Sequence, residues 1–312
     1  MEFGASIFFT DYSITPAELA VAMEERGFDS VWAAEHSHIP VPRRTRADSE
    51  LGKRYYDVMD PFVTLTVAAC ATKRLKIATG ICLVIQRDTI QTAKLVSSLD
   101  QVSGGRFLFG IGGGWNQEEI ENHGTVFATR MQKMREQIEA MKAIWTETKP
   151  EYHGELVDFG TIMTWPKPVQ KPHPPVILGG AFPWAARRAV RYGDGWYPNA
   201  ASGNPEEYLP AFRKMAQDAG RDPATLPVTI GGGPDDLDKL KRFRDLGAAR
   251  VNVSLMSEAA DDILAILDKW AGHPPTARLR RRQLRRAAET EGLRGRCASV
   301  RRASPDARIV AP

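Results

Sequence analysis

The sequence has few cysteines and no long hydrophobic run. Its three cysteines, Cys70, Cys82 and Cys297, are odd in number and widely spaced. Such a set does not form a disulfide framework and favours a reducing compartment, the cytoplasm. No apolar stretch approaches the roughly 18 residues of a membrane span. Residues 1–4 lack the basic segment that precedes a secretory signal. These absences predict a cytoplasmic protein with no membrane partner.

Signatures of several common enzyme classes are also missing. There is no Gly-x-Ser-x-Gly elbow for acyl transfer and no Walker loop for nucleotide hydrolysis. Residues 110–115 begin like the fingerprint of a dinucleotide-binding Rossmann domain. However, Trp115 occupies the position where that fingerprint requires its third glycine. The sequence therefore disfavours a Rossmann site.

Charge is distributed unevenly, and lysine is absent from the last 41 residues. Residues 272–312 hold 11 arginines and 3 acids, a net charge of +8, whereas residues 1–271 hold 31 basic and 35 acidic residues, a net charge of −4. The tail has no aromatic residue to stack on bases and no DNA-binding motif, which disfavours a nucleic-acid partner. We expect the Arg-rich tail, residues 272–312, to be disordered or translated out of frame.

Residues 1–271 alternate short apolar runs with segments of helical periodicity. The clearest helix spans 131–145, where apolar residues recur at spacings of three and four. Predicted strands cover 3–9, 30–34, 75–84, 106–111, 176–178, 195–197, 226–230 and 250–255. Strands that alternate with helices form parallel sheets, and eight such units fit a (β/α)₈ TIM barrel. The pattern predicts this fold over 1–271, with an irregular excursion at 150–175; an open doubly wound sheet is the alternative.

Glycine runs follow several of the predicted strands. In a barrel of this kind the carboxyl ends of the strands carry the functional residues. Glycines stand there at 112–114, 179–180 and 231–233. They either turn the chain or let a flat ring or a phosphate approach the backbone N–H groups. Because several runs lie on one face, a bound anionic cofactor is the better explanation.

One histidine stands directly at a strand end. His36 follows the second predicted strand, where it can donate a proton or a hydrogen bond in the barrel mouth, or serve as a structural histidine bonded to the backbone. His38 lies on the same face of an extended segment, whereas Glu35 lies on the other, so a metal site is not expected.

Basic residues gather in the long loop after the second strand. They are interspersed with acids, which predicts a solvated, mobile lid, although a few of the arginines could face a polyanionic cofactor. The basic residues are Arg43, Arg44, Arg46, Lys53 and Arg54.

The segment 95–115, which reads LVSSLDQVSGGRFLFGIGGGW, resembles a hallmark of the bacterial luciferase-like flavin and deazaflavin oxidoreductases. Other stretches agree with the family in order: 27–32 with Glu35-His36, 167–170, 174–176 and 193–196. The resemblance covers roughly residues 1–271 and is greatest to the branch that uses coenzyme F420.

The resemblance implies a barrel that holds a deazaflavin at its carboxyl face, commonly as a homodimer. It places a cis peptide at Gly80-Ile81 and His36 near the reactive face of the ring. It assigns contacts with the ring and the phosphate-bearing chain to Gly112, Gly113, Gly179, Gly180, Ala181 and Asn199. The family's sugar-phosphate dehydrogenases carry a catalytic glutamate where this chain has Trp115, which argues against sugar-phosphate oxidation. An indole there instead suggests packing against the cofactor or an apolar substrate.

The implied function is hydride transfer between coenzyme F420 and a small organic substrate, with His36 as proton donor or ring orienter. One alternative is a monooxygenase that uses reduced FMN and oxygen. Another is a protein that binds F420 without catalysis.

Overall fold

The computed structural model describes residues 1–41 and 51–272. The second-loop residues Arg43, Arg44 and Arg46, and the predicted tail apart from Gly272, lie outside the described residues.

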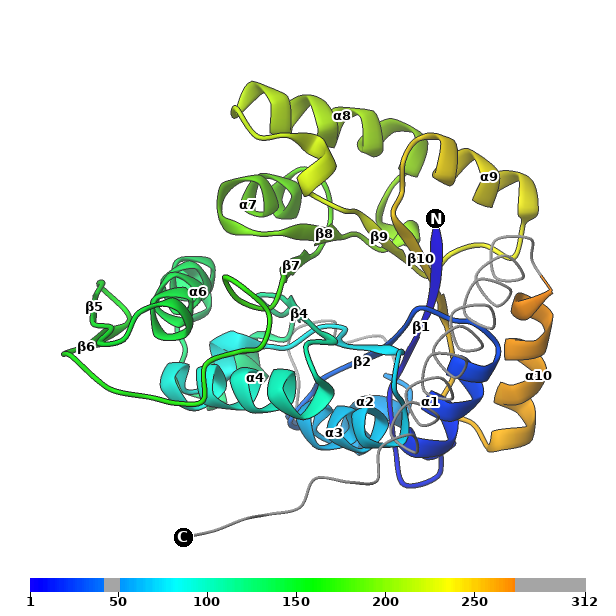
Figure 1. The fold of residues 1–312 in the computed structure, drawn as a ribbon, viewed down its shortest axis with the longest axis horizontal. Helices are drawn as coiled ribbons and strands as arrows, with labels where there is room; N and C mark the ends of the chain where they lie inside the picture. The colour runs from blue at the N-terminus through cyan, green and yellow to red at the C-terminus, as the bar shows by residue number, and fades with distance from the viewer. Residues whose placement is uncertain (42–50, 273–312) are drawn as a thin grey trace, which may run out of the picture.

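Eight parallel strands form the predicted barrel (Figure 1). Their spatial order is β8-β7-β4-β3-β2-β1-β10-β9, and isolated parallel bridges join Trp196 to Val228 and Asn199 to Gly231, which close the ring between β8 and β9. The fold is therefore a TIM barrel and not an open doubly wound sheet. The strands are β1 (Glu2–Ile7), β2 (Ser30–Ala33), β3 (Lys76–Thr79), β4 (Phe107–Ile111), β7 (Val176–Gly179), β8 (Gly195–Tyr197), β9 (Thr229–Gly231) and β10 (Arg250–Ser254).

Helices surround the strands and follow the predicted order (Figure 1). Local sequence sets their ends: Thr15 accepts a hydrogen bond from the Glu18 amide before the first helix, and Gly104 ends the fourth at φ 65°. The helices are α1 (Pro16–Glu25), α2 (Arg54–Asp57), α3 (Pro61–Ala71), α4 (Thr89–Ser103), α5 (Gln117–Asn122), α6 (Arg130–Thr146), α7 (Trp184–Tyr192), α8 (Pro205–Asp218), α9 (Leu237–Asp245) and α10 (Ala260–Ala271).

The structure differs from the sequence prediction in several elements. The third strand ends at Thr79 rather than reaching position 84, because Leu83 donates its amide to the Glu35 side chain and Val84–Gln86 forms a 3₁₀ turn. The short helices α2 and α5 were not predicted. The excursion at 150–175 contains a hairpin, β5 (Tyr152–His153) and β6 (Asp158–Phe159), which projects beside α6 in Figure 1.

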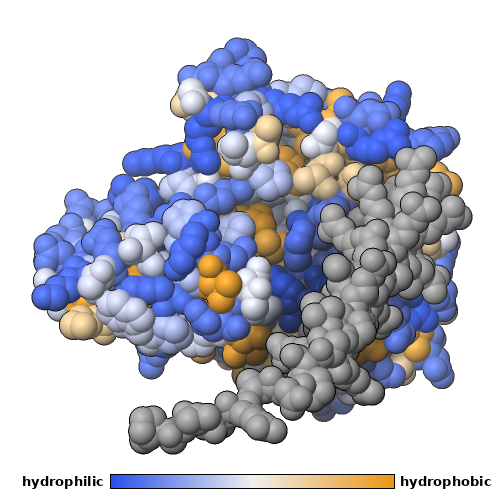
Figure 2. Space-filling view, in the orientation of Figure 1, coloured by the Kyte–Doolittle hydropathy of each residue, from blue (hydrophilic) through white to orange (hydrophobic). Residues whose placement is uncertain are grey.

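Buried apolar side chains form one large cluster and a smaller separate one, in which Trp32, Ala78, Leu108 and Ile177 come from β2, β3, β4 and β7. The largest fully buried ones include Trp32, Trp145 and Trp196. Figure 2 shows hydrophobic residues at the centre of the view within a mostly hydrophilic surface. No helix within residues 1–41 and 51–272 is both long and apolar enough to cross a membrane.

Candidate functional site

A cavity of about 820 Å³ opens at the carboxyl ends of the barrel strands. Residues that end or follow every one of the eight strands line it. The lining includes all the residues that the sequence predicted for the site: His36, Gly80, Ile81, Gly112, Gly113, Trp115, Gly179, Gly180, Ala181 and Asn199. The fold thus brings the whole predicted set to one place.

His36 follows β2 and is held by a carboxylate from α5. Its Nδ1 lies 2.8 Å from Oε2 of Glu119, and the two side chains are 7% and 1% exposed. The other carboxylate oxygen accepts the Ser37 amide at 3.1 Å. With Nδ1 donating to Glu119, the other ring nitrogen, Nε2, is the one available to a molecule in the cavity.

Glu119 is a residue of the candidate site that the sequence reasoning did not identify. Position 115 holds no carboxylate, as the sequence shows, but Glu119 brings one to His36 from four residues further along the chain. A signal was present: Asn116 followed by Glu118 and Glu119 is typical of a helix N-terminus. The six residues of α5 are too few to produce an apolar period, so the helix was not recognised.

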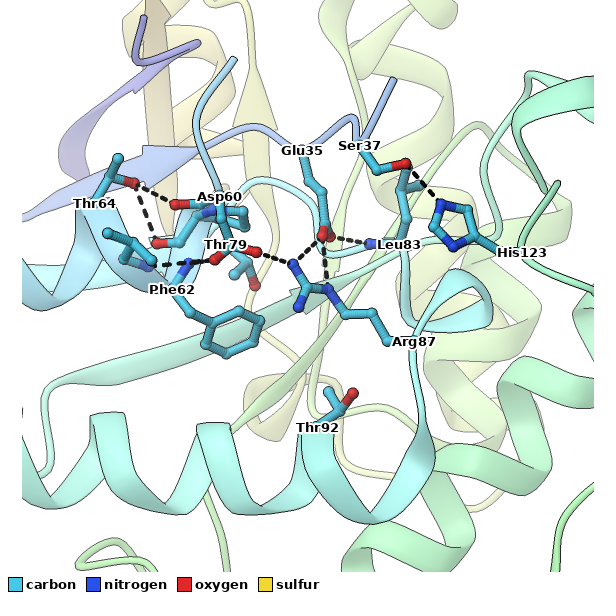
Figure 3. Close-up of polar contacts among 12 residues, drawn as sticks. Glu35, Ser37, Asp60, Phe62, Thr64, Thr79, Leu83, Arg87, Thr92 and His123 are labelled. Atoms are coloured by element: carbon cyan, nitrogen blue, oxygen red, sulfur yellow. Dashed lines mark hydrogen bonds and ion pairs between the residues drawn. The ribbon is translucent and has the colours of Figure 1, made fainter. Parts of the chain in front are cut away.

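Glu35 points away from His36, as the sequence predicted. Its Oε2 accepts the Leu83 amide at 2.6 Å, and its Oε1 pairs with Arg87. Figure 3 shows Arg87 between Glu35 and Asp60, which caps α3 through the Phe62 amide. Burial alone would lower the pKa of Arg87, but the adjacent carboxylate of Glu35 raises it above its usual range. This network joins the end of β2 to α3 and to the start of α4.

Aromatic rings cluster around His36. The ring centre of Trp115 lies 5.7 Å from that of His36 in an edge-on arrangement, and the ring centre of Tyr55 lies 5.4 Å from it. Phe8 lies nearly parallel to the imidazole at 6.5 Å. Arg54 also lines the cavity instead of lying wholly in a solvated lid, and its guanidinium faces the rings of Phe8 and Tyr55.

Glycines let the Ile81 side chain lie across the floor of the cavity. The Gly80–Ile81 peptide is cis, at the place that the family resemblance implied. A Cβ at Gly112 would lie 1.9 Å from Cδ1 of Ile81, and one at Gly179 would lie 2.8 Å from its Cγ2. Side chains at positions 112 and 179 would therefore displace Ile81.

Two arginines, one from α6 and one from α7, line the cavity, and each has a guanidinium nitrogen that makes no hydrogen bond to the described residues. The Nε atoms of Arg130 and Arg188 are buried and find no hydrogen-bond partner among the described residues. Burial lowers the pKa of both guanidinium groups, and the charge of Arg188 lowers that of Arg130 further. An anion beside them would relieve both effects.

Asn199 is partly engaged in the chain itself. Its Oδ1 accepts the Ala201 amide at 2.8 Å, which caps a 3₁₀ turn after β8. Outside the cavity, Ser37 Oγ lies 2.8 Å from His38 and 2.7 Å from His123, the latter contact being visible in Figure 3. Burial, followed by the neighbouring His38, lowers the pKa of His123.

Comparison with known sequences gives a family match across most of the chain. Residues 15–234 match the model of the luciferase-like monooxygenases. An uncharacterized protein of Mycobacterium tuberculosis is 37% identical over 87% of this chain and 98% of its own length. The F420-dependent hydroxymycolic acid dehydrogenase of the same organism is 28% identical over 70% of this chain and 57% of that protein. The FMNH₂-dependent dimethylsulfone monooxygenase of Pseudomonas putida is 32% identical over 42% of this chain and 37% of that protein.

Solved structures show the same fold. The monooxygenase RslO1 from Streptomyces bottropensis has a TM-score of 0.71 and 20% identity, covering 88% of this chain and 98% of that one. The coenzyme F420-dependent tetrahydromethanopterin reductase of Methanopyrus kandleri has a TM-score of 0.66 and 18% identity, covering 87% of this chain and 97% of that one.

Proposed function

Because the chain belongs to the family of luciferase-like monooxygenases, whose members include F420-dependent and FMN-dependent enzymes, we propose that it transfers hydride between coenzyme F420 and a small organic substrate. The observation that carries the proposal is the pairing of buried His36 with Glu119 at the mouth of a barrel that has a glycine-lined floor. F420-dependent relatives support the choice of deazaflavin.

The cavity fits a cofactor with a flat ring and an anionic side chain. Ile81 packs directly against Gly112 and Gly179 because neither glycine carries a Cβ, and a planar ring can lie against this apolar part of the cavity wall. The unsatisfied Nε atoms of Arg130 and Arg188 suit the phosphate of such a cofactor. We propose that these residues hold the deazaflavin, together with Gly80, Gly113, Gly180, Ala181 and Asn199.

A bound deazaflavin would supply or accept the hydride itself. The protein's part in reduction is to deliver a proton. In the proposed step His36 carries a proton on both ring nitrogens. Its Nε2–H donates to the substrate atom that becomes electron-rich when the hydride arrives at its neighbour, which leaves a neutral imidazole with its proton on Nδ1. A C=O bond then becomes CH–OH, and a C=C bond becomes CH–CH. Glu119 fixes the imidazole so that Nε2 faces the cavity. Trp115 and Tyr55 pack around the imidazole of His36 and limit the access of water to it.

A second candidate is an FMN-dependent monooxygenase, which the similarity to an FMNH₂-dependent enzyme favours. The two readings predict opposite responses to oxygen. The F420 enzyme would turn over without oxygen, whereas the monooxygenase would require it and would consume it in proportion to product.

The test is to titrate the purified protein with F420 and with FMN, and to follow the absorbance of each cofactor. We expect tighter binding of F420. We also expect oxidation of reduced F420 by an aldehyde or enone panel in the absence of oxygen. Tighter binding of FMN with oxygen-dependent turnover would favour the monooxygenase. Tight binding of F420 with no turnover on the panel would identify a non-catalytic binding protein.

A further inference from the structure

Arg54 is a charged group in the cavity for which the described residues supply no oxygen partner. Its Nη1 lies 2.7 Å from the sulfur of Met256, and its guanidinium carbon lies 5.3 Å and 5.6 Å from the ring centres of Phe8 and Tyr55. Within residues 1–41 and 51–272, no carboxylate forms an ion pair with it. The preceding residue, Lys53, is by contrast paired with Asp57 at 3.2 Å.

A thioether sulfur and two ring faces are weak partners for a guanidinium group. Its planar N–H donors match the two oxygens of a carboxylate, and such charge-assisted pairs are roughly twice as strong as neutral hydrogen bonds. The guanidinium of Arg54 thus presents N–H donors in the cavity, and the described side chains provide no carboxylate to accept from them.

Aromatic surfaces lie directly beside this guanidinium. The ring centres of Phe8 and Tyr55 are 4.9 Å apart, and those of Tyr55 and Trp115 are 6.4 Å apart. All three rings also lie within 6.5 Å of His36. Rings at these separations offer edges and faces to another planar group. A flat ligand here would contact the imidazole.

This subsite is separate from the arginines assigned above to the cofactor phosphate. Arg54 belongs to α2, which follows β2, whereas Arg130 and Arg188 belong to helices that follow β4 and β7. In the barrel, β3 lies between β2 and β4, and β7 lies beyond β4. Arg54 therefore reaches the cavity from a different side than Arg130 and Arg188 do. It remains available for a second anion when the cofactor phosphate lies beside the other two arginines.

We propose that Phe8, Tyr55, Trp115 and Arg54 form the substrate subsite, and that it takes a planar aromatic or conjugated molecule bearing a carboxylate. The ring would pack among the aromatic side chains beside His36, and the carboxylate would accept hydrogen bonds from Arg54. The naming of this ligand as the substrate rests on the proposed function, but the binding of the carboxylate does not.

The test compares two probes with the same ring and aldehyde, 4-formylbenzoate and its methyl ester, in which a methyl group removes the negative charge; binding is measured by isothermal titration calorimetry with the full chain, free and F420-loaded. We expect the acid to bind at least about tenfold more tightly than the ester. Arg54→Gln should weaken binding of the acid by about ten- to a hundredfold and leave the ester within about threefold. Lys53→Gln, a neutralisation one residue away that is paired outside the cavity, is the matched control and should change neither.

Equal affinity for acid and ester in the native protein would overturn the proposal. So would an equal loss of both in Arg54→Gln, or the same effect in Lys53→Gln. Circular dichroism and a thermal melt establish that each variant is folded. Turnover separates the two hypotheses: if the acid binds through Arg54 but reduced F420 is never oxidised, the proposed function fails and the subsite stands. If reduced F420 is oxidised equally by both probes, with equal affinities, the subsite fails and the function stands.

Discussion

Nδ1 of His36 lies 2.8 Å from Oε2 of Glu119, although the two residues are 83 positions apart in the chain. The second oxygen of the same carboxylate accepts the amide of Ser37 at 3.1 Å. One carboxylate thus binds both the side chain of His36 and the backbone that carries it. Because both side chains are almost fully buried, this pair fixes the orientation of the imidazole in the cavity.

The first prediction concerns the role of this pair in turnover. His36→Ala should lower kcat by about 10²–10⁴-fold if the imidazole is the proton donor. Glu119→Gln keeps the shape but cannot accept from both donors, so it should lower kcat by about tenfold and leave KM and cofactor affinity nearly unchanged. Glu119→Asp should recover part of the loss. The measurements are steady-state kinetics and a cofactor titration.

Glu121→Gln is the control for these variants. Glu121 lies on the same helix but is exposed and bonded to Gln117. It should turn over like the native protein. Native turnover in His36→Ala would contradict the proposed role of His36, and native kcat in Glu119→Gln would contradict the positioning role of Glu119.

The second prediction concerns the arginines from α6 and α7. FMN and riboflavin differ by one phosphate, so their affinities isolate its contribution. Arg188→Gln should weaken the binding of FMN by about tenfold or more and leave the affinity for riboflavin unchanged. The reason is that only FMN places an anion beside the unsatisfied Nε of Arg188. Quenching of flavin fluorescence measures both.

Arg187→Gln is the matched control for this variant. Arg187 is the adjacent residue of α7, and its guanidinium lies over the exposed ring of Trp184 at 4.9 Å instead of lining the cavity. It should change neither affinity. Equal weakening of FMN and riboflavin in Arg188→Gln would show that Arg188 supports the fold of the site and not the phosphate.

The barrel was predictable because its signals are local. The helix predicted at 131–145 is observed as Arg130–Thr146, and the strand predicted at 250–255 is observed as Arg250–Ser254. In both, apolar residues repeat with the period of the structure, and the carboxyl ends of parallel strands necessarily share one face of the barrel. The gathering of His36 with the glycine-rich strand ends follows from that rule.

The charged side chains of the cavity were not predictable in the same way. Glu119 meets His36 only after the barrel closes, and α5 is too short to show a period. Arg188 stands between Arg187 and Arg191 in a basic stretch that reads as a solvated helix face. Only the rotation of α7 in the fold turns Arg188 to the cavity. Neither a contact between residues distant in the chain nor the rotation of a helix in the fold can be read from composition or from the spacing of residues.

The third prediction concerns the close approach of β3 and β4. A Cβ at Gly110 would lie 2.1 Å from the backbone oxygen of Thr79, and a backbone atom in a barrel cannot move aside as a side chain can. Gly110→Ala should therefore lower the free energy of unfolding by about 1–3 kcal/mol, measured by urea denaturation. In the control Gly160→Ala the added Cβ meets no heavy atom within 4 Å, so stability should barely change. Equal midpoints for the two variants would contradict the packing argument.

The fourth prediction concerns stability against acid. Asp29 accepts hydrogen bonds from Arg250 at 2.6 Å and Lys76 at 2.9 Å. Burial alone would raise the pKa of Asp29, but the charges of Arg250 and Lys76 outweigh burial and lower it. A carboxyl whose pKa is lower in the folded state stabilises the fold above its unfolded pKa of about 3.9, and this contribution is lost as the pH falls through the folded pKa.

Asp29→Asn should therefore lower the free energy of unfolding at pH 7 by about 2–4 kcal/mol, because the guanidinium of Arg250 loses its buried partner. The difference from the native protein should shrink below about pH 4, because the Asp29 carboxyl of the unfolded chain takes up a proton there, before the native carboxylate does at its lower pKa. Urea denaturation between pH 7 and pH 3 measures both effects. Asp218→Asn, which removes an exposed pair with Lys214, is the control and should give a small difference. A large Asp29→Asn difference that stays constant down to pH 3 would show that the loss comes from packing and not from the charge of Asp29.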